Sequence, residues 1–184
     1  HRSGWAGDDR PAVAWHTGRD VCDGEFRGRR PVRPIERSHS IHHPEADDPD
    51  TVRSGWLSMG PKTIRFENEF NGYIGSKRSI AVSSWTAAGH LTLEAFGLKA
   101  GDEVIVPTMT FPATAEIVCY FGAKPVIVDV DPGTLNLTVE DVEKAVTPKT
   151  KVIIPVHYGG QPCDMDEILE FARSKNIKVF EDAA

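Results

Sequence analysis

The chain has 184 residues, 40% of them hydrophobic and 26% charged, which is typical of a globular protein with one core. Its formal net charge of −6 argues against nucleic acid or an anionic membrane as its main partner, and no apolar run is long enough for a membrane helix. Three cysteines without C-x-x-C spacing favour reduced thiols of a cytoplasmic protein over a disulfide or metal framework.

Residues 1–50 differ in composition from the rest of the chain. They hold eight arginines and no lysine, whereas residues 51–184 hold four arginines and nine lysines. The stretch RGRRPVRPIERSHSIHHPEADDPD shows neither helical nor strand periodicity and is rich in proline and charge. We therefore expect residues 1–50 to be a disordered or artefactual segment and residues 51–184 to form the folded part.

From residue 52 onward, apolar strands alternate with amphipathic helices. Helical spacing of apolar residues, and Thr138 followed three residues later by Asp141 as in a capping box, predict the helices. This alternation predicts the α/β class, with a mostly parallel sheet covered by helices on both faces. In chain order the predicted elements are a helix at 66–74, a strand at 80–82, a strand at 103–107, a helix at 117–121, a strand at 125–130, a helix at 139–146, a strand at 152–156, a helix at 165–172 and a strand at 177–180.

Small hydroxyl residues follow the first predicted strand. The stretch SSWTAA, residues 83–88, offers free N–H groups at the positive end of a helix beginning near Thr86, which suits a phosphate group. Taken alone, this stretch is explained more simply as an ordinary helix N-cap. The dinucleotide and P-loop interpretations lack their glycine-rich fingerprints.

An aromatic residue and a carboxylate stand at two other strand ends. Phe111, in PTMTFPATA, could lie flat on a planar cofactor, although packing of a helix against the sheet is the simpler role. Asp182, in FEDAA, would be costly to bury unless it meets a cation such as a protonated pyridine nitrogen, or several donors such as a helix N-terminus. The adjacent Glu181 has no assigned role. A phosphate site, a ring stack and a pyridinium partner together describe pyridoxal phosphate, although no single one does.

Several longer motifs follow one another in order along the chain. They are RSGWLSMGP, IAVSSWTAAGHLTLEAFGLKAGDEVIVPTMTFPATA, GAKPVIVDVDPGTLNL, AVTPKTKVIIPVHYGGQPCDMDEI and VFEDAA. Through these motifs, from about Val52 to Ala184, the chain resembles the DegT/DnrJ/EryC1/StrS family of pyridoxal-phosphate sugar aminotransferases, most of all the bacterial 4-amino-4-deoxy-arabinose aminotransferases. The resemblance implies that residues 51–184 are the N-terminal part of the large domain of the type I, aspartate-aminotransferase-like fold, whereas residues 1–50 match nothing in the family.

The resemblance also implies roles for particular residues. Thr86 and Ala87 would hold the cofactor phosphate, Thr86 with its hydroxyl and both with backbone N–H groups. Phe111 would stack on the pyridine ring, and Asp182 would pair with the pyridine nitrogen. The loop of residues 56–61 would lie near a sugar-nucleotide pocket.

The chain departs from the family pattern at two neighbouring positions. Trp85 stands where the family usually has a small residue, and Gly89 stands before His90 where the family tends to have Leu or Met. His157, in PVHYGG, resembles a family position, but a core histidine with satisfied hydrogen bonds explains it at least as well. The family's Schiff-base lysine lies beyond the EDAA motif, so we expect this chain to stop before the catalytic lysine.

The resemblance implies transfer of an amino group from glutamate or a similar amino acid to a keto nucleotide-sugar. Such enzymes serve the biosynthesis of cell-surface polysaccharide, lipopolysaccharide or antibiotic sugars, and act as homodimers with pyridoxal phosphate. We expect the 184-residue chain alone to be inactive. A pyridoxal-phosphate-dependent deoxysugar dehydratase of the same family and a non-catalytic remnant stay open as alternatives.

Overall fold

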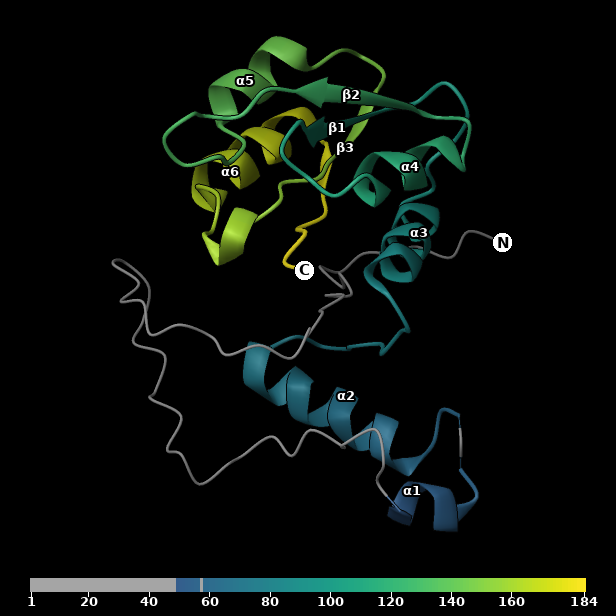
Figure 1. The fold of residues 1–184 in the computed structure, drawn as a ribbon. Helices are drawn as coiled ribbons and strands as arrows, with labels where there is room; N and C mark the ends of the chain where they lie inside the picture. Colours follow the sequence, from purple (N-terminus) through teal and green to yellow (C-terminus); the bar gives the residue numbers. More distant parts are fainter. Residues whose placement is uncertain (1–48, 57) are drawn as a thin grey trace.

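The computed structural model of the chain describes residues 49–56 and 58–184. The prediction for residues 1–50 therefore falls outside the described residues, apart from Pro49 and Asp50. Two helices, α1 (Pro49–Ser54) and α2 (Pro61–Ile74), come first and lie apart from the sheet-containing part of the chain (Figure 1).

Four parallel strands form a sheet in the order β2-β1-β3-β4, which confirms the predicted α/β class. The sheet places β1 and β3 between their neighbours, so all residues of β1 and all but Lys151 of β3 are buried, which explains the apolar runs at 104–107 and 152–153. The strands are β1 (Glu103–Pro107), β2 (Lys124–Val128), β3 (Thr150–Ile153) and β4 (Lys178–Val179).

Helices cover both faces of the sheet, as predicted (Figure 1). Val104 and Val106 pack in one core with α3 (Trp85–Ala95) and α4 (Ala113–Cys119). Ile105 points to the other face, because successive strand side chains alternate, and packs in a second core with α5 and α6. These two helices span Val139–Ala145 and Met165–Lys175.

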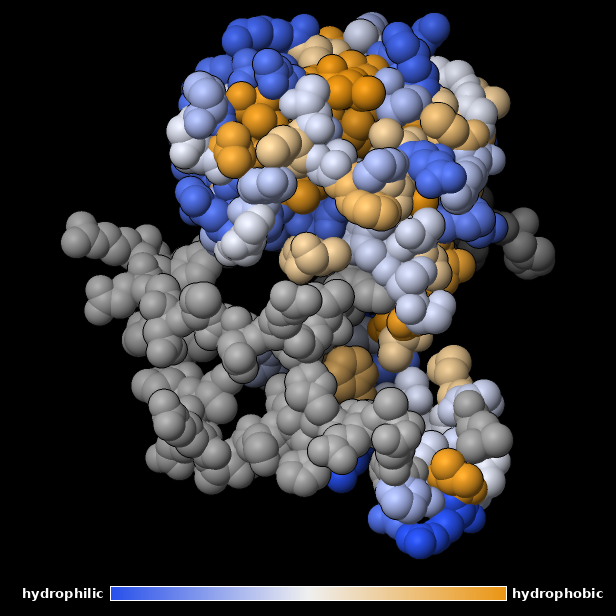
Figure 2. Space-filling view, viewed as in Figure 1, coloured by the Kyte–Doolittle hydropathy of each residue, from blue (hydrophilic) through white to orange (hydrophobic). Residues whose placement is uncertain are grey.

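The predicted cap of α5 is present in the structure. Thr138 Oγ1 accepts a hydrogen bond from the Asp141 N–H at 3.3 Å and donates to Asp141 Oδ2 at 2.8 Å. The edge strand β2 is less covered than β1: Ile127 is 61% exposed, and Figure 2 shows hydrophobic residues at the surface over β2. Cys119 and Cys163 are free thiols, while Cys22 lies outside the described residues.

The strand predicted at 80–82 does not form, and that prediction is wrong. No described strand runs beside these residues to complete a hydrogen-bonded ladder. The Ala81 N–H donates instead to Glu67 Oε1 at 2.8 Å, and Ile80 is 52% exposed. The apolar sequence alone therefore predicted a strand that lacks a neighbour in the described part of the chain.

The predicted strand at 152–156 is shorter in the structure, because β3 ends at Ile153 and Pro155 has no N–H to continue a ladder. Pairing then resumes as a single parallel bridge between Val156 and Asp182. In this bridge the Asp182 N–H donates to Pro155 O and the His157 N–H donates to Asp182 O, each at 2.9 Å. The bridge fixes the backbone of Asp182 beside the end of β3.

The helix α6 ends at Asn176, which has a left-handed backbone with φ 56°. We expect Asn176→Ala to lower the free energy of unfolding by about 1 kcal/mol, because a Cβ-bearing residue without a short polar group is disfavoured there. Asn176→Gly should match or exceed the wild-type protein in stability. Urea unfolding followed by circular dichroism measures both variants, and equal losses for Ala and Gly would contradict the explanation.

Candidate active site

A cleft of about 340 Å³ lies beyond the carboxyl ends of β1, β3 and β4 and beside the start of α3. In a parallel α/β sheet this is the edge where ligands bind. Three residues singled out in the sequence, Thr86, Phe111 and Asp182, line this one cleft, although they are far apart in the chain. Ala87 follows directly after Thr86 but is not among the lining residues.

Asp182 is a buried carboxylate, with only 5% of its surface exposed. Its Oδ2 accepts a hydrogen bond from Thr114 Oγ1 and its Oδ1 accepts one from the Ala184 N–H, both at 3.2 Å. Burial raises the pKa of Asp182, while the Ala184 N–H, the Thr114 hydroxyl and the charge of His157 act in the opposite direction. Two long hydrogen bonds only partly replace the lost water, so the carboxylate is suited to a cation placed in the cleft.

Thr114 is a residue that the sequence analysis missed. It is fully buried in the first turn of α4 and lines the cleft. Its hydroxyl donates to Asp182, so the hydroxyl of Thr110, at 2.7 Å, donates to Thr114 in turn. The signal in the sequence was two threonines four residues apart beside Phe111, a spacing that brings side chains together at the start of a helix.

The N-terminus of α3 lies at one end of the cleft. Ser84 is the N-cap residue, and its Oγ accepts a hydrogen bond from the Ala87 N–H at 3.2 Å. Thr86 lines the cleft, and neither its N–H nor its hydroxyl has a hydrogen-bond partner among the described residues. The helix end is therefore an ordinary N-cap that still offers donors to an anion, so the two interpretations of this stretch are compatible.

Phe111 projects from the loop after β1, and 77% of its surface is exposed. It does not pack in either hydrophobic core, so the alternative of a residue that packs α4 against the sheet is wrong. At the edge of the cleft this exposed ring is free to stack on a planar ligand.

His157 lies beside Asp182 and has satisfied hydrogen bonds. Its Nε2 is 3.2 Å from Glu181 Oε2, and its Nδ1 accepts from the Cys163 N–H at 3.2 Å. The Cys163 side chain and the Glu181 carboxylate act to raise the pKa of His157 above its ordinary value. The bond from the Cys163 N–H opposes protonation at Nδ1, and the tautomer with its proton on Nε2 satisfies both contacts.

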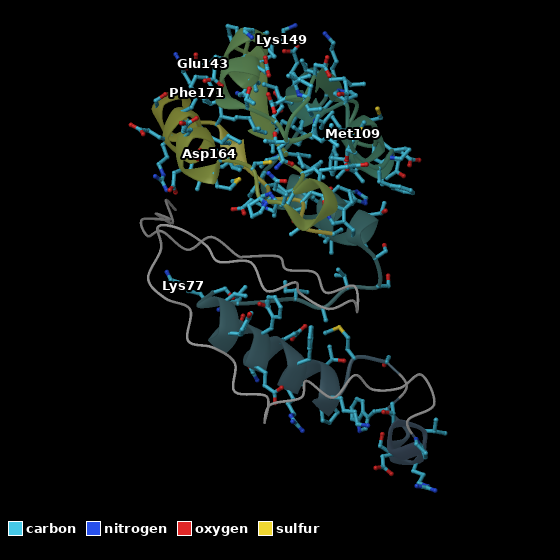
Figure 3. All side chains as sticks on the ribbon, turned by 60° about the vertical axis from the view of Figure 1, so that its left-hand side comes forward. Lys77, Met109, Glu143, Lys149, Asp164 and Phe171 are labelled. Atoms are coloured by element: carbon cyan, nitrogen blue, oxygen red, sulfur yellow. The ribbon has the colours of Figure 1, made fainter. Side chains whose placement is uncertain are left out.

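No lysine lines this cleft in the part of the chain that the structure describes. Figure 3 shows Lys77 beyond the end of α2, away from the sheet, and Lys149 just ahead of β3, at the sheet edge opposite the cleft. Residues 56 and 58–61 of the loop before α2 do not line it either, and Leu57 lies outside the described residues. The expected role of that loop stays a prediction.

The described residues contain no helix with the length and apolar character needed to cross a bilayer. Residues 49–56 and 58–184 also include no group of three or more His, Cys, Asp or Glu side chains that could hold a metal ion.

Comparison with known proteins identifies the family. The model of the DegT/DnrJ/EryC1/StrS aminotransferase family matches residues 45–184. The uncharacterised protein MJ1066 of Methanocaldococcus jannaschii is 53% identical over 135 residues, and the spore coat polysaccharide biosynthesis protein SpsC of Bacillus subtilis is 50% identical over 135 residues. Each match covers 73% of this chain and 35% of the relative, so the chain spans about a third of the length of these relatives.

A solved structure gives the same result for the fold. The structure of NtdA from Bacillus subtilis, with bound cofactor PMP, matches 73% of this chain and 31% of its own, with a TM-score of 0.71 and 38% identity. This likeness bears out the predicted fold of the large domain. On the family match and these identities, the chain belongs to the DegT/DnrJ/EryC1/StrS aminotransferase family.

Proposed function

We propose that the whole protein is a pyridoxal-phosphate-dependent aminotransferase that moves an amino group from an amino acid, with glutamate as the expected donor, to a keto nucleotide-sugar. The observation that carries the proposal is the shared cleft: a buried carboxylate, an exposed aromatic ring and an open helix N-terminus meet there. Family membership and a relative named for polysaccharide biosynthesis support the sugar substrate.

The donors around the cleft fit this cofactor at both of its ends. Asp182 is buried with only two side-chain hydrogen bonds, so a protonated pyridine nitrogen would supply the cation that it lacks. Thr86 has an N–H and a hydroxyl available for a phosphate at the start of α3. When bound, pyridoxal phosphate supplies an electron sink for amino-group transfer.

Each residue would make a separate contribution in this proposal. Asp182 keeps a proton on the ring nitrogen, and Thr114 holds Oδ2 in place for that contact. Phe111 covers one face of the ring and keeps water from it. Thr86 orients the cofactor through its phosphate, and Ala87 adds its N–H only where the phosphate replaces the Ser84 hydroxyl.

The catalytic lysine of such an enzyme would come from a part of the protein that this chain does not supply, because no lysine lines the described cleft. We therefore expect the 184-residue chain to bind the cofactor and not to turn over substrate. Incubation with glutamate, pyridoxal phosphate and a keto nucleotide-sugar should give no amino sugar by mass spectrometry. Formation of an amino sugar at a rate that scales with protein concentration would overturn this expectation.

Binding of pyridoxamine 5′-phosphate tests the cleft most directly, because its amine cannot condense with surface lysines. We expect Asp182→Ala to weaken binding by about tenfold or more, since a hydrogen bond to a charged group contributes about 1.5–3 kcal/mol. Titration calorimetry measures the affinity. Glu181→Gln is the matched control, because Glu181 is adjacent but exposed, and it should bind as the wild-type protein does.

Phe111 is tested in the same assay. We expect Phe111→Ala to weaken binding of pyridoxamine 5′-phosphate by about three- to tenfold, because an aromatic stack contributes roughly 0.5–1.5 kcal/mol beyond area burial. Phe111→Tyr keeps the ring and should retain the affinity. An unchanged affinity of the alanine variant would remove the ring stack from the proposal, since 77% exposure leaves this side chain little structural role.

The raised pKa of Asp182 predicts how stability depends on pH. The carboxyl contributes stability that is fully present below its unfolded pKa and is lost as pH rises through the raised folded pKa. We therefore expect Asp182→Asn to become more stable relative to the wild-type protein as pH rises above the ordinary Asp pKa of about 3.9. Urea midpoints across this range measure the difference. A loss of stability of Asp182→Asn relative to the wild-type protein as pH rises would contradict the sign derived above.

A further inference from the structure

Trp85 joins the two ends of the cleft through an aromatic contact. It is the first residue of α3, directly before Thr86, and it lines the cleft. Its ring stacks on Phe180 with a centroid distance of 5.8 Å and an interplanar angle of 16°. Phe180 is 5% exposed and lies two residues before Asp182. The stack therefore connects the helix end that carries Thr86 to the strand end that carries Asp182.

Gly89 makes room for this contact. A Cβ atom at Gly89 would lie 2.5 Å from Ile117 Cδ1, 3.4 Å from Trp85 Cη2 and 3.5 Å from Phe180 Cε1. Residues 85 and 89 are one helical turn apart and share a face of α3. A Cβ would clash with Ile117 but would only touch Trp85 and Phe180, so it is the atoms beyond a Cβ that would compete for the space beside the indole ring.

We propose that Trp85 is a positioning residue of the cofactor site: its stack on Phe180, which Gly89 permits, fixes the start of α3 against the end of β4 and so holds Thr86 and Asp182 at opposite ends of the cleft. The proposal rests on the proposed cofactor for its functional meaning. Its structural content, that Trp85 orders the segment around Asp182, stands on the contacts alone.

The contact depends on the shape of the ring rather than on its N–H group. Trp85 Nε1 is buried and has no hydrogen-bond partner among the described residues. Such an unsatisfied donor opposes folding, so the indole is not held by a polar contact there. Trp85→Phe keeps an aromatic stack without the orphan donor, and it is the conservative variant for the test.

The first measurement is a stability cycle on Trp85→Ala, Gly89→Met and the double variant by urea unfolding. Trp85→Ala leaves a void and Gly89→Met crowds Ile117, so each single variant should be less stable than the wild-type protein. In the double variant a methionine at position 89 can fill the space that the indole leaves, so the double variant should regain most of the stability. If the losses of the two single variants simply add in the double variant, the side chains at positions 85 and 89 do not share that space and this part of the proposal is overturned.

The second measurement is amide hydrogen exchange at Asp182 and His157, whose N–H groups form the bridge between the ends of β3 and β4. Without the aromatic stack, these amides should exchange about tenfold faster in the double variant than in the wild-type protein, although global stability is regained. Trp85→Phe should keep the wild-type rates. The Ile154 amide, bonded to Ile105 O inside the sheet, is the control and should not change.

If the amides of Asp182 and His157 exchange as slowly in the double variant as in the wild-type protein, the proposal is overturned. Trp85 would then only fill space, which a methionine at position 89 fills equally well. Binding of pyridoxamine 5′-phosphate separates this result from the proposed function. Failure of the wild-type protein to bind would sink the proposed cofactor, while the exchange rates still decide the role of Trp85. If the double variant shows fast amide exchange at Asp182 and His157 but still binds pyridoxamine 5′-phosphate with wild-type affinity, then Trp85 does not position the cofactor site.

Discussion

The candidate site depends on the burial of one carboxylate. Asp182 lies at the end of β4, and only 5% of its surface is exposed. The surrounding core disfavours a negative charge there, and only two hydrogen bonds to the carboxylate stabilise that charge. The sheet tolerates this arrangement because the backbone of Asp182 is held in a bridge to Val156. Stability is thus reduced at the position where the proposed chemistry needs a negative charge, as is common at functional sites.

Much of the fold could be predicted, because its strands follow from local pattern. Residues 104–107 are apolar throughout, and the structure buries them between two neighbouring strands and two helix layers. The stretch 80–82 is similarly apolar yet forms no strand, since a strand needs a partner and the sequence does not say which segment lies beside it. The helix α2 was likewise predicted correctly from the spacing of its apolar residues, but none of these residues is buried in the described chain.

Site residues could be predicted from the sequence where a residue of that type has few other roles at that position. A carboxylate after a buried strand, such as Asp182, is unusual enough to single out, and Phe111 stood out as an aromatic residue in a loop. Thr114 did not, because threonine fits many roles and its bond to Asp182 spans 68 residues of sequence. Trp85 and Gly89 looked like two separate irregularities, and only the distances from Gly89 to Ile117 and Trp85 show that they are coupled.

The cap at the start of α3 has a consequence for how a ligand would enter the cleft. The Ser84 hydroxyl already satisfies the Ala87 N–H, so the helix end keeps its conformation without an anion. An arriving phosphate that took this N–H would exchange one oxygen acceptor for another and would gain little from that single bond. The cap therefore keeps the helix end ordered before a ligand arrives, which reduces the entropy cost of binding. The affinity then depends on the donors of Thr86 and on Asp182 at the other end of the cleft.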